Sequence, residues 1–221
     1  MNILFLRVGI DRGCGGRLSP IAQDRSFEFV PIPERAAVTQ GMRYGDIKAR
    51  SGGTLADVIG YDGPTHYDPE FVTFSYGEPS HPKRSQLLRL EKGDHLVFYA
   101  GFQGASIETG TCCIVGYLVV NAVHAMRPDL DWPPAQLNHL DNAHFRRIKR
   151  EDSLVVVEGD RDSSRLLIRA VPLSDATQHV LPDIAQILGF SGSVMRAVGR
   201  WVPNAQVDAT LAWIQTWNSE D

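Results

Sequence analysis

The chain has 221 residues, of which 43% are hydrophobic, 22% charged and 9% aromatic. These are the values of an ordinary globular protein, and they exclude disordered, collagen-like and fibrous classes. Lys and Arg total 22 against 26 Asp and Glu, so the net charge of -4 lacks the basic surplus of proteins that grip long duplex DNA. The longest apolar runs, such as 112–115, are far shorter than the roughly 20 residues of a membrane span.

The N-terminal residues and the cysteines bear on the expected cellular compartment. The opening Met-Asn-Ile-Leu-Phe-Leu-Arg is interpreted as a first strand and not as a signal peptide. Cys14, Cys112 and Cys113 are odd in number and lack CxxC spacing, which argues against a disulfide framework and a zinc knuckle. Adjacent cysteines in a strand point to opposite faces, so at least one is expected to be buried. We expect a cytoplasmic location and no membrane partner.

The first half of the chain is predicted to combine short strands with long connections. Strands are predicted at residues 2–8, 27–32, 71–74 and 85–90. The first strand runs into a glycine-dense turn at 9–16, and residues 36–60 form a long connection with one short helix near 55–59.

The second half opens with the clearest pattern. Residues 95–102 and 111–123 are β-rich and flank a polar loop, which predicts a hairpin. A short helix is predicted from Pro133 to Leu140, since proline suits the first helical turn. Residues 153–157 and 165–173 are expected to pair around the polar turn between them.

The end of the chain is predicted to be helical. A helix at 182–188 is stopped by Gly189, and apolar residues recur at helical spacing at Val207, Leu211, Ile214 and Trp217. We therefore expect an α+β fold with a curled mixed β-sheet or small barrel, peripheral helices and a helical tail. Residues 1–221 are predicted as a single domain, with a β-rich core over about 1–175 and a helical part over 176–221.

The predicted hairpin carries a resemblance to a known fold. Gly93-Asp94-His95-Leu-Val-Phe-Tyr99, followed by Cys113-Ile-Val-Gly-Tyr-Leu-Val119, resembles the core hairpin of PUA-like domains, notably the EVE branch. That resemblance implies a small barrel whose cleft accepts a flipped or modified base.

Several motifs in a fixed order carry a second resemblance. They are Arg7-Val-Gly-Ile-Asp11, Gly15-Gly16-Arg-Leu-Ser19-Pro20-Ile21, Pro31-Ile32-Pro33, His66-Tyr-Asp68-Pro69, Tyr76-Gly-Glu78, Leu88-Arg-Leu90, Asn142-Ala-His144-Phe-Arg146 and Ser164-Arg165-Leu-Leu167. Together they are similar to a family called nucleotide modification associated domain, third type. The resemblance implies a role in pathways of modified nucleotides in bacteria and their viruses, with partner enzymes of such a pathway. It leaves both the reaction and the cofactor unspecified.

The loop at 9–16 has two readings. Its glycines let the backbone approach a ligand and let its amides form an anion nest, beside Asp11 and Ser19. The same glycines also suit a purely structural turn with positive φ. The GxGxxG spacing and the Gly-Lys-Ser/Thr ending of phosphate loops are both missing.

His66 and Asp68 form the second candidate. They lie two residues apart, on one side of an extended segment, between Pro64 and Pro69. A carboxylate beside an imidazole can orient it as a general base, or both can ligate a metal. The simpler reading is a hydrogen-bonded loop histidine, and no metal ligand is assigned from the sequence.

Three further groups have both a functional and a structural reading. His144 and Asn142 can contact a base edge or complete a helix end. Tyr99 and Phe102 can stack on a base or pack in the core. Arg165, after Ser164, can hold a phosphate or pair with a nearby acid. The basic run at 146–150 likewise suits a phosphate site or a solvated helix end.

Two functions follow. The first is an enzyme that acts on a nucleotide or a flipped base, with Asp11 and His66 in acid/base catalysis and Asp68 orienting His66. Its substrate-binding candidates are Arg7, Ser19, Arg84, Tyr99, Asn142, His144, Ser164 and Arg165. The alternative is a non-catalytic reader of modified bases with an aromatic cage of Tyr99, Phe102 and Trp132. Convergence of Asp11, His66 and Asp68 in one pocket would favour the enzyme.

Overall fold

The computed structural model describes residues 1–127, 133–196 and 198–217. The strands are β1 (Ile3–Arg7), β2 (Ser19–Ile21), β3 (Ile32–Pro33), β4 (Met42–Arg43), β5 (Pro64–His66), β6 (Ser75–Glu78), β7 (His95–Gly104), β8 (Cys112–Met126), β9 (Leu154–Gly159), β10 (Arg165–Pro172) and β11 (Arg200–Trp201). The α-helices are α1 (Leu55–Ile59), α2 (His81–Leu87), α3 (Pro182–Leu188) and α4 (Val207–Thr216). Short 3-10 turns are η1 (Tyr44–Asp46), η2 (Ala135–Leu137), η3 (Ala143–Arg146) and η4 (Asn204–Gln206).

The main sheet is mixed and has eight strands. Its path runs β11-β1-β7-β8-β9-β6, with β10 paired to β8 and β2 paired to β7. β1 and β2 run parallel to β7, whereas the β7–β8, β8–β9 and β6–β9 pairs are antiparallel. A second sheet of three short strands has the order β3-β5-β4.

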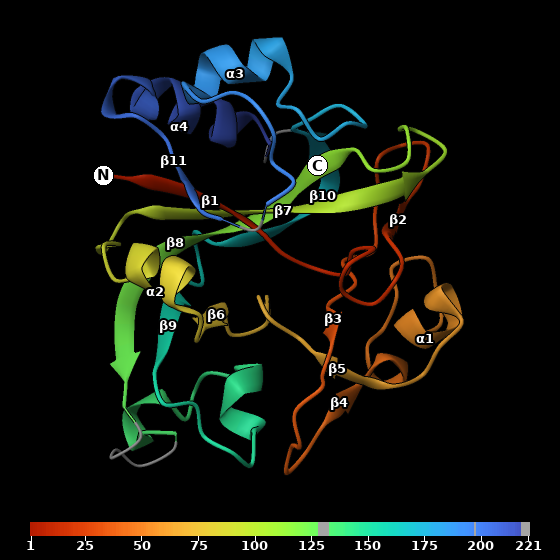
Figure 1. The fold of residues 1–221 in the computed structure, drawn as a ribbon, viewed down its shortest axis with the longest axis vertical. Helices are drawn as coiled ribbons and strands as arrows, with labels where there is room; N and C mark the ends of the chain where they lie inside the picture. The colour runs from red at the N-terminus through yellow and green to blue at the C-terminus, as the bar shows by residue number, and fades with distance from the viewer. Residues whose placement is uncertain (128–132, 197, 218–221) are drawn as a thin grey trace.

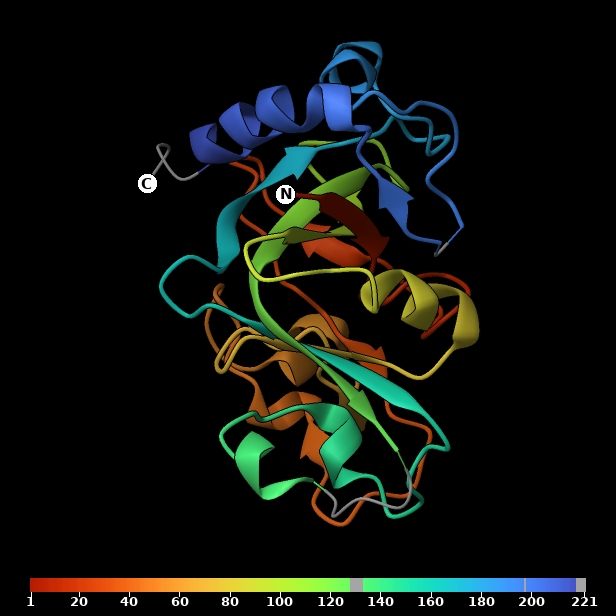
Figure 2. The ribbon, with the colours of Figure 1, turned by 90° about the vertical axis from the view of Figure 1, so that its left-hand side faces the viewer.

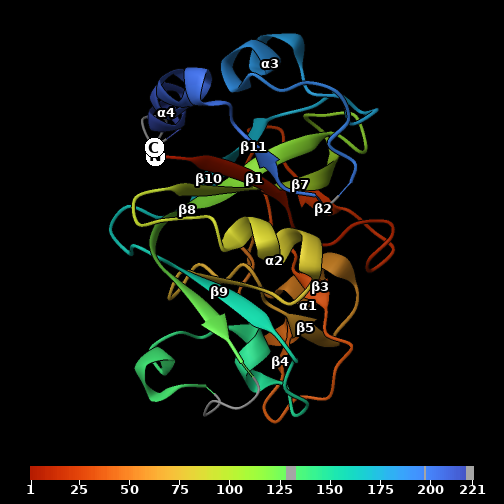
Figure 3. The same ribbon diagram turned by 60° about the vertical axis from the view of Figure 1, so that its left-hand side comes forward.

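Strand β8 connects the two halves of the main sheet. Its first part, Cys112–Val119, pairs with β7, and its last part, Val120–Met126, pairs with β9. Because each part has a different partner, the 15-residue strand carries the sheet from the core toward β6. Figure 2 shows this long strand bending away from β7 and continuing beside β9. Helix α2 lies at this bend, next to β9 (Figure 3).

The core gathers around the β1–β7–β8 part of the sheet. Strand β1 is buried along its whole length, as a strand covered on both faces must be. Helices α3 and α4 lie together over one side of these strands, and the β3-β5-β4 sheet lies beyond the other side (Figure 1). Phe190 after α3 contacts Phe5, and Trp217 at the end of α4 contacts Tyr117. The buried pair Cys112 and Cys113 belongs to this core.

Several predicted elements are confirmed. The first strand, the hairpin β7–β8, the helices α3 and α4, and the short helix α1 all form. Helix α1 begins where Thr54 caps Asp57 and ends at Gly60, which has a φ of 65°. The periodic face of α4 is buried at Val207 and Ile214.

Other predicted elements are wrong. Residues 71–74 form a turn, and the strand begins at Ser75. Residues 85–90, predicted as a strand, form the end of α2 (85–87) and the turn after it, because Pro82 sits in the first turn of a helix that a short apolar run does not reveal. Of 27–32, only Ile32 enters a strand, although the segment is buried. The predicted helix 133–140 is reduced to η2.

The predicted pairing of 153–157 with 165–173 is also wrong. Strand β9 pairs with β8 and β6, and β10 pairs with the first part of β8. The length of β8 explains these pairings, because β10 pairs with its first part and β9 with its last part. The mixed α+β class is confirmed, and the described strands follow an open path without closing into a barrel. No helix in the described residues is long and apolar enough to cross a membrane.

Asp94 anchors the N-terminal strand to the turn before β7. Its carboxylate accepts hydrogen bonds from Asn2 N at 2.6 Å, Asn2 Nδ2 at 3.0 Å and Glu91 N at 2.9 Å. The side chain is 2% exposed, so water cannot replace these bonds. The Gly-Asp turn noted in the sequence therefore fixes the register of β1 against β7.

We expect Asp94→Ala to lower the free energy of unfolding by about 2–4 kcal/mol, because buried donors lose a charged acceptor. Chemical denaturation measures the change. Asp162→Ala, at an exposed position of the turn after β9, is the matched control and should stay within about 0.5 kcal/mol of wild type. Equal effects of the two substitutions would contradict the anchoring role.

Candidate functional site

Three side chains from distant parts of the chain meet at one point. Nε2 of His66 lies 3.2 Å from Nε2 of His144. Oδ2 of Asp68 lies 3.3 Å from Nε2 of His144 and 3.7 Å from Nε2 of His66. All three residues are buried, and their side chains point toward one another. We call these three residues the His–Asp–His centre.

The centre forms where the small sheet faces the outer half of the main sheet. His66 ends β5, opposite Ile32 of β3, and Asp68 follows two residues later. His144 comes from η3, whose first turn is capped by Asn142. The side-chain oxygen of Asn142 accepts a hydrogen bond from the His144 backbone N at 3.1 Å. The chain thus approaches the centre from two sides.

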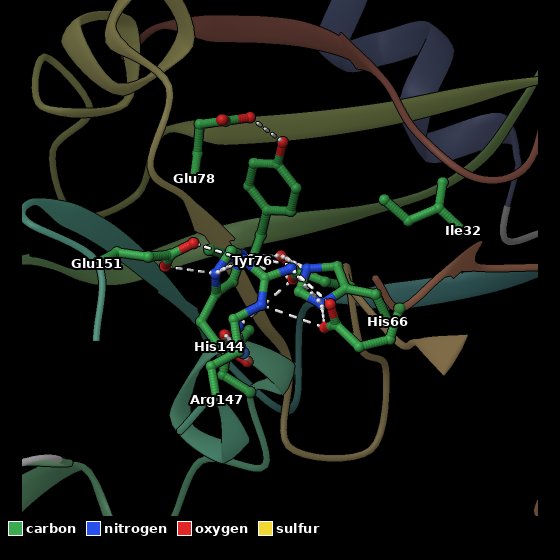
Figure 4. Close-up of polar contacts among 12 residues, drawn as sticks. Ile32, His66, Tyr76, Glu78, His144, Arg147 and Glu151 are labelled. Atoms are coloured by element: carbon green, nitrogen blue, oxygen red, sulfur yellow. Dashed lines mark hydrogen bonds and ion pairs between the residues drawn. The ribbon is translucent and has the colours of Figure 1, made fainter. Parts of the chain in front are cut away.

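A carboxylate lies behind each histidine ring. Nδ1 of His66 is 2.7 Å from Oε2 of Glu34, and Nδ1 of His144 is 2.7 Å from Oε2 of Glu151. Arg147 lies between these two carboxylates and pairs with both, through Nη2 to Glu34 at 3.1 Å and through Nη1 to Glu151. Figure 4 shows this network, with His66 and His144 approaching from different elements.

The network keeps its acids ionised. Burial alone would raise the pKa of Glu34, but hydrogen bonds from His66, the Ala36 amide and Arg147 outweigh it and lower the pKa to about 2. Burial likewise acts against the lowered pKa of Glu151, which His144 and Arg147 bring about. Burial would lower the pKa of His144, yet Asp68 and Glu151 raise it to about 9.

Asp68 is held in a fixed orientation. The backbone N of Gly77 donates to Oδ1 at 3.1 Å and Oδ2 at 3.0 Å, and Asn142 Nδ2 donates to Oδ1 at 3.4 Å. Asn142 also donates to Ser75 Oγ at 3.0 Å. These donors turn Oδ2 toward the two histidines. Residue 77, in β6, is a glycine, because a Cβ at this position would lie only 2.5 Å from His144 Cδ2.

The centre opens onto a cavity of about 330 Å³. The cavity is lined by Arg7, Val8, Gly9, Asp11, Cys14, Ile32, His66, Asp68, Tyr76, Gly77, Glu78, Pro79, Lys83, His144 and Arg147. One wall is the glycine loop after β1, where Asp11 accepts from Cys14 N at 2.6 Å and lies 3.7 Å from Arg7 Nε. Arg7 also donates to Gln178 and to the Met195 carbonyl, so the C-terminal segment supports this wall.

A second group of ionised side chains, formed by Glu78 and Lys83, also lines the cavity. The Tyr76 hydroxyl donates to Glu78 Oε2 at 3.0 Å, and Lys83 pairs with the same carboxylate. Burial acts to raise the pKa of Glu78, but Lys83 and Ser80 lower it overall. Burial, together with Glu78 and Asp68, raises the pKa of Tyr76. Figure 4 shows the Tyr76 ring leading from the centre to Glu78.

The structure brings together a large part of the predicted site. Arg7, Asp11, His66, Asp68 and His144 all line the cavity. Asn142 does not line it, but its side chain contacts Asp68 and the His144 backbone. Each histidine also has a carboxylate partner, Glu34 for His66 and Glu151 for His144, which the His-x-Asp spacing does not reveal.

Other predicted site residues lie elsewhere. Ser19 and Ser164 are fully buried in the fold, and Ser164 Oγ accepts from Val119 N at 3.0 Å. Tyr99 and Phe102 are buried core residues of β7, because that strand is covered on both faces. The hydroxyl of Tyr99 donates to the Val194 carbonyl at 3.2 Å.

The two remaining arginines are outside the cavity wall. Arg84 belongs to α2, and the residue of that helix that lines the cavity is Lys83. Arg165 is exposed on β10 and donates to the Ser164 carbonyl at 2.7 Å. Trp132 lies outside the described residues. None of the positions described for these residues fits direct contact with a ligand in the cavity.

Sequence reasoning missed the residues behind the centre. Glu34, Glu151 and Lys83 were not singled out, Glu78 was noted only within the motif Tyr76-Gly-Glu78, and Arg147 only within a basic run. Glu34 is 113 residues from Arg147, a separation that no local spacing reveals. The signal within reach was Glu151 directly after the basic run, at a spacing of four from Arg147.

The centre has the composition of a cation site. Two imidazole nitrogens and one carboxylate oxygen are common ligands of metal ions, and their atoms all lie within 4.8 Å of one another. The same atoms can also exchange a proton with a bound substrate or with water. His66, Asp68 and His144 are therefore the residues that could hold a metal.

We expect Gly77→Ala to displace His144. The added Cβ would lie 2.5 Å from His144 Cδ2 and 2.9 Å from Asn142 Oδ1, so the ring must move away from Asp68. Histidine ring signals in nuclear magnetic resonance spectra measure this shift for His66 and His144. The signals of His124 and His139, which both contact Glu158, serve as internal controls and should not change. Unchanged signals of His66 and His144 would contradict the packing described for Gly77.

Comparison with known proteins gives one match. The model of a family described as nucleotide modification associated domain 3 matches residues 2–210. No curated protein and no solved structure matches the chain.

Proposed function

Because the chain belongs to the nucleotide modification associated domain 3 family, we propose that it is an enzyme acting on a nucleotide or on a base flipped out of nucleic acid. The reaction takes place at the His–Asp–His centre, inside the cavity that the centre lines. His66, Asp68 and His144 activate the reacting group, and Asp11 on the facing loop is an acid/base candidate.

A single observation carries this proposal. Asp11 lies more than 50 residues before the His66–Asp68 pair in the chain, yet all three residues line one cavity. A carboxylate lies behind each histidine, buried for Glu34 and partly buried for Glu151, an arrangement that orients imidazoles for chemistry. Burying so many ionisable groups costs folding free energy, and active sites are where proteins accept that cost.

The cavity suits a small anionic substrate. Its volume of about 330 Å³ lies in the usual range for small-molecule sites, and a single nucleotide or flipped base is of this scale. Lys83 stands at its edge with a side chain that is 22% exposed. We infer that Lys83, together with Arg7, contacts the phosphate, so that Lys83 takes the place of the substrate-binding candidates Arg84 and Arg165, which lie outside the cavity wall.

The reader of modified bases receives less support. Its predicted cage depends on Tyr99 and Phe102, and both rings are fully buried, with Phe102 packed edge-on against Phe27. A cage requires aromatic faces open to a ligand. We infer that the hairpin β7–β8 corresponds to the PUA-like core hairpin, supported by the Gly93-Asp94 turn before β7. That correspondence concerns the fold of the hairpin, whereas the proposed chemistry depends on the His–Asp–His centre.

The proposed function is tested by the nucleoside composition of cells. We expect expression of the wild-type chain to create or remove a nucleoside in the nucleotide pool, DNA or transfer RNA, measured by mass spectrometry. Asp68→Asn should lower this effect by about 10²-fold or more, since it removes a charge that orients the centre. His124→Gln, whose imidazole pairs with Glu158 outside the cavity, is the control and should keep wild-type activity. A profile equal in wild type and Asp68→Asn would sink the enzyme proposal.

A second substitution tests the facing loop. Asp11→Asn keeps an oxygen to accept the Cys14 N–H but removes the negative charge. If Asp11 transfers a proton, the rate should fall about 10²-fold while the free energy of unfolding changes little. Thermal unfolding measured beside the nucleoside profile separates the two effects. Full activity of Asp11→Asn would exclude Asp11 from the chemistry and leave the centre alone.

A further inference from the structure

The hydrogen bonds of the two histidines fix where their protons lie. A carboxylate oxygen of Glu34 at 2.7 Å from His66 Nδ1 can only accept, so this nitrogen carries the proton. The same holds for His144 Nδ1 beside Glu151. Arg147 lies 3.3 Å from each Nδ1, a longer contact that leaves this assignment unchanged. In neutral rings, both Nε2 atoms therefore present a lone pair.

These lone pairs face each other and a carboxylate. The two Nε2 atoms are 3.2 Å apart, and Oδ2 of Asp68 is 3.3 Å and 3.7 Å from them. Three acceptors at these distances repel one another unless a metal cation or a proton lies between them. Gly77 N also directs Oδ2 inward, so the fold holds the third acceptor in place.

The spacing matches that of ligands around one metal ion. Ligand atoms about 2.1 Å from an ion lie roughly 3.0–3.4 Å apart at octahedral or tetrahedral angles. Two of the three separations, 3.2 Å and 3.3 Å, fall in this range, and a small rotation of the Asp68 carboxylate would shorten the 3.7 Å separation.

The charge of the surroundings also suits a dication. Asp68, Glu34 and Glu151 bring three negative charges, and Arg147 brings one positive charge. As metal ligands both imidazoles are neutral, and the named groups then sum to two negative charges. Without a metal, a proton on His144, whose pKa burial would lower but Asp68 and Glu151 raise, offsets one of these charges. An unpaired buried charge is strongly unfavourable, and one divalent cation balances this excess.

We propose that His66, His144 and Asp68 bind one divalent transition-metal ion. Two imidazoles and one carboxylate suit zinc, iron, cobalt, nickel or manganese and do not suit calcium or magnesium, which take oxygen ligands. Glu34 and Glu151 orient the ligands, as carboxylates commonly do behind metal-bound histidines. The inference deepens the proposed function and rests on it only for the ion's use in a reaction.

The position of the ion explains why the ligands line a cavity. Three protein ligands leave coordination positions free, and a structural site would be closed by a fourth. His66, Asp68 and His144 all border the cavity, so those positions face a substrate or water. A metal bound in this way lowers the pKa of a coordinated water or polarises a substrate oxygen.

The test is metal binding by the purified full chain. After removal of metals with a chelator, Zn²⁺ or Co²⁺ alone is titrated in and followed by calorimetry, and bound metal is counted by mass spectrometry. We expect one ion per chain. Co²⁺ should also shift the ring signals of His66 and His144, while those of His124 and His139 stay in place.

The variants separate ligands from their supports. Asp68→Asn and His144→Gln should each weaken binding by about 100-fold or more, and Glu34→Gln by about 10–100-fold, because Glu34 acts through His66. His124→Gln, from the partly exposed His124–Glu158–His139 group outside the cavity, is the matched control and should bind like wild type. Circular dichroism shows which variants are folded. If one of them is unfolded, Glu151→Gln is measured in its place, because Glu151 supports His144 as Glu34 supports His66.

Two results would overturn the proposal. One is a chelator-treated wild type that takes up no ion, and the other is equal binding by wild type, Asp68→Asn and His144→Gln. Binding is measured without substrate, so its outcome is independent of the proposed function. Nucleoside changes without metal binding would leave proton transfer as the chemistry, and metal binding without nucleoside changes would count against the enzyme alone.

Discussion

Two carboxylates, one buried and one partly buried, each lie within hydrogen-bond distance of a histidine ring and hold the candidate site together. Glu34 and Glu151 sit behind His66 and His144, and Arg147 joins both acids from the side. Removing one partner from such a network leaves a buried charge without compensation, which costs several kcal/mol. The network therefore fixes the orientation of the rings and also joins the segment around β3 and β5 to the segment before β9.

The long strand β8 provides the frame on which this site is built. Its first part completes the core with β7 and β10, and its last part carries β9 and, through it, β6. Gly77 of β6 then reaches Asp68, so the position of the site depends on a bend in one continuous strand. The main sheet thus builds the core around β1, β7 and the first part of β8, and it contacts the centre through Gly77 of β6 at the other end of the sheet.

The predictability of this structure followed the range of the interactions. Helices α3 and α4 were visible in the sequence because their apolar spacing and stop signals are local. The strands predicted at 71–74 and 85–90 failed because short apolar runs suit more than one structure, and β9 and β10 were paired wrongly because a longer strand competes for both. At the site, His66 and Asp68 are neighbours in sequence and could be found. Glu34 could not, since its contact with Arg147 spans 113 residues.

The small sheet β3-β5-β4 consists of strands of two or three residues, so its ladders contain few hydrogen bonds. Much of what keeps it closed is the contact of Glu34 and His66 with the opposite segment. Its local unfolding therefore requires opening the centre, and the free energy of that opening includes the binding free energy of any bound ion or substrate. Amide hydrogen exchange in this sheet consequently depends on the occupancy of the cavity that Ile32 and His66 line.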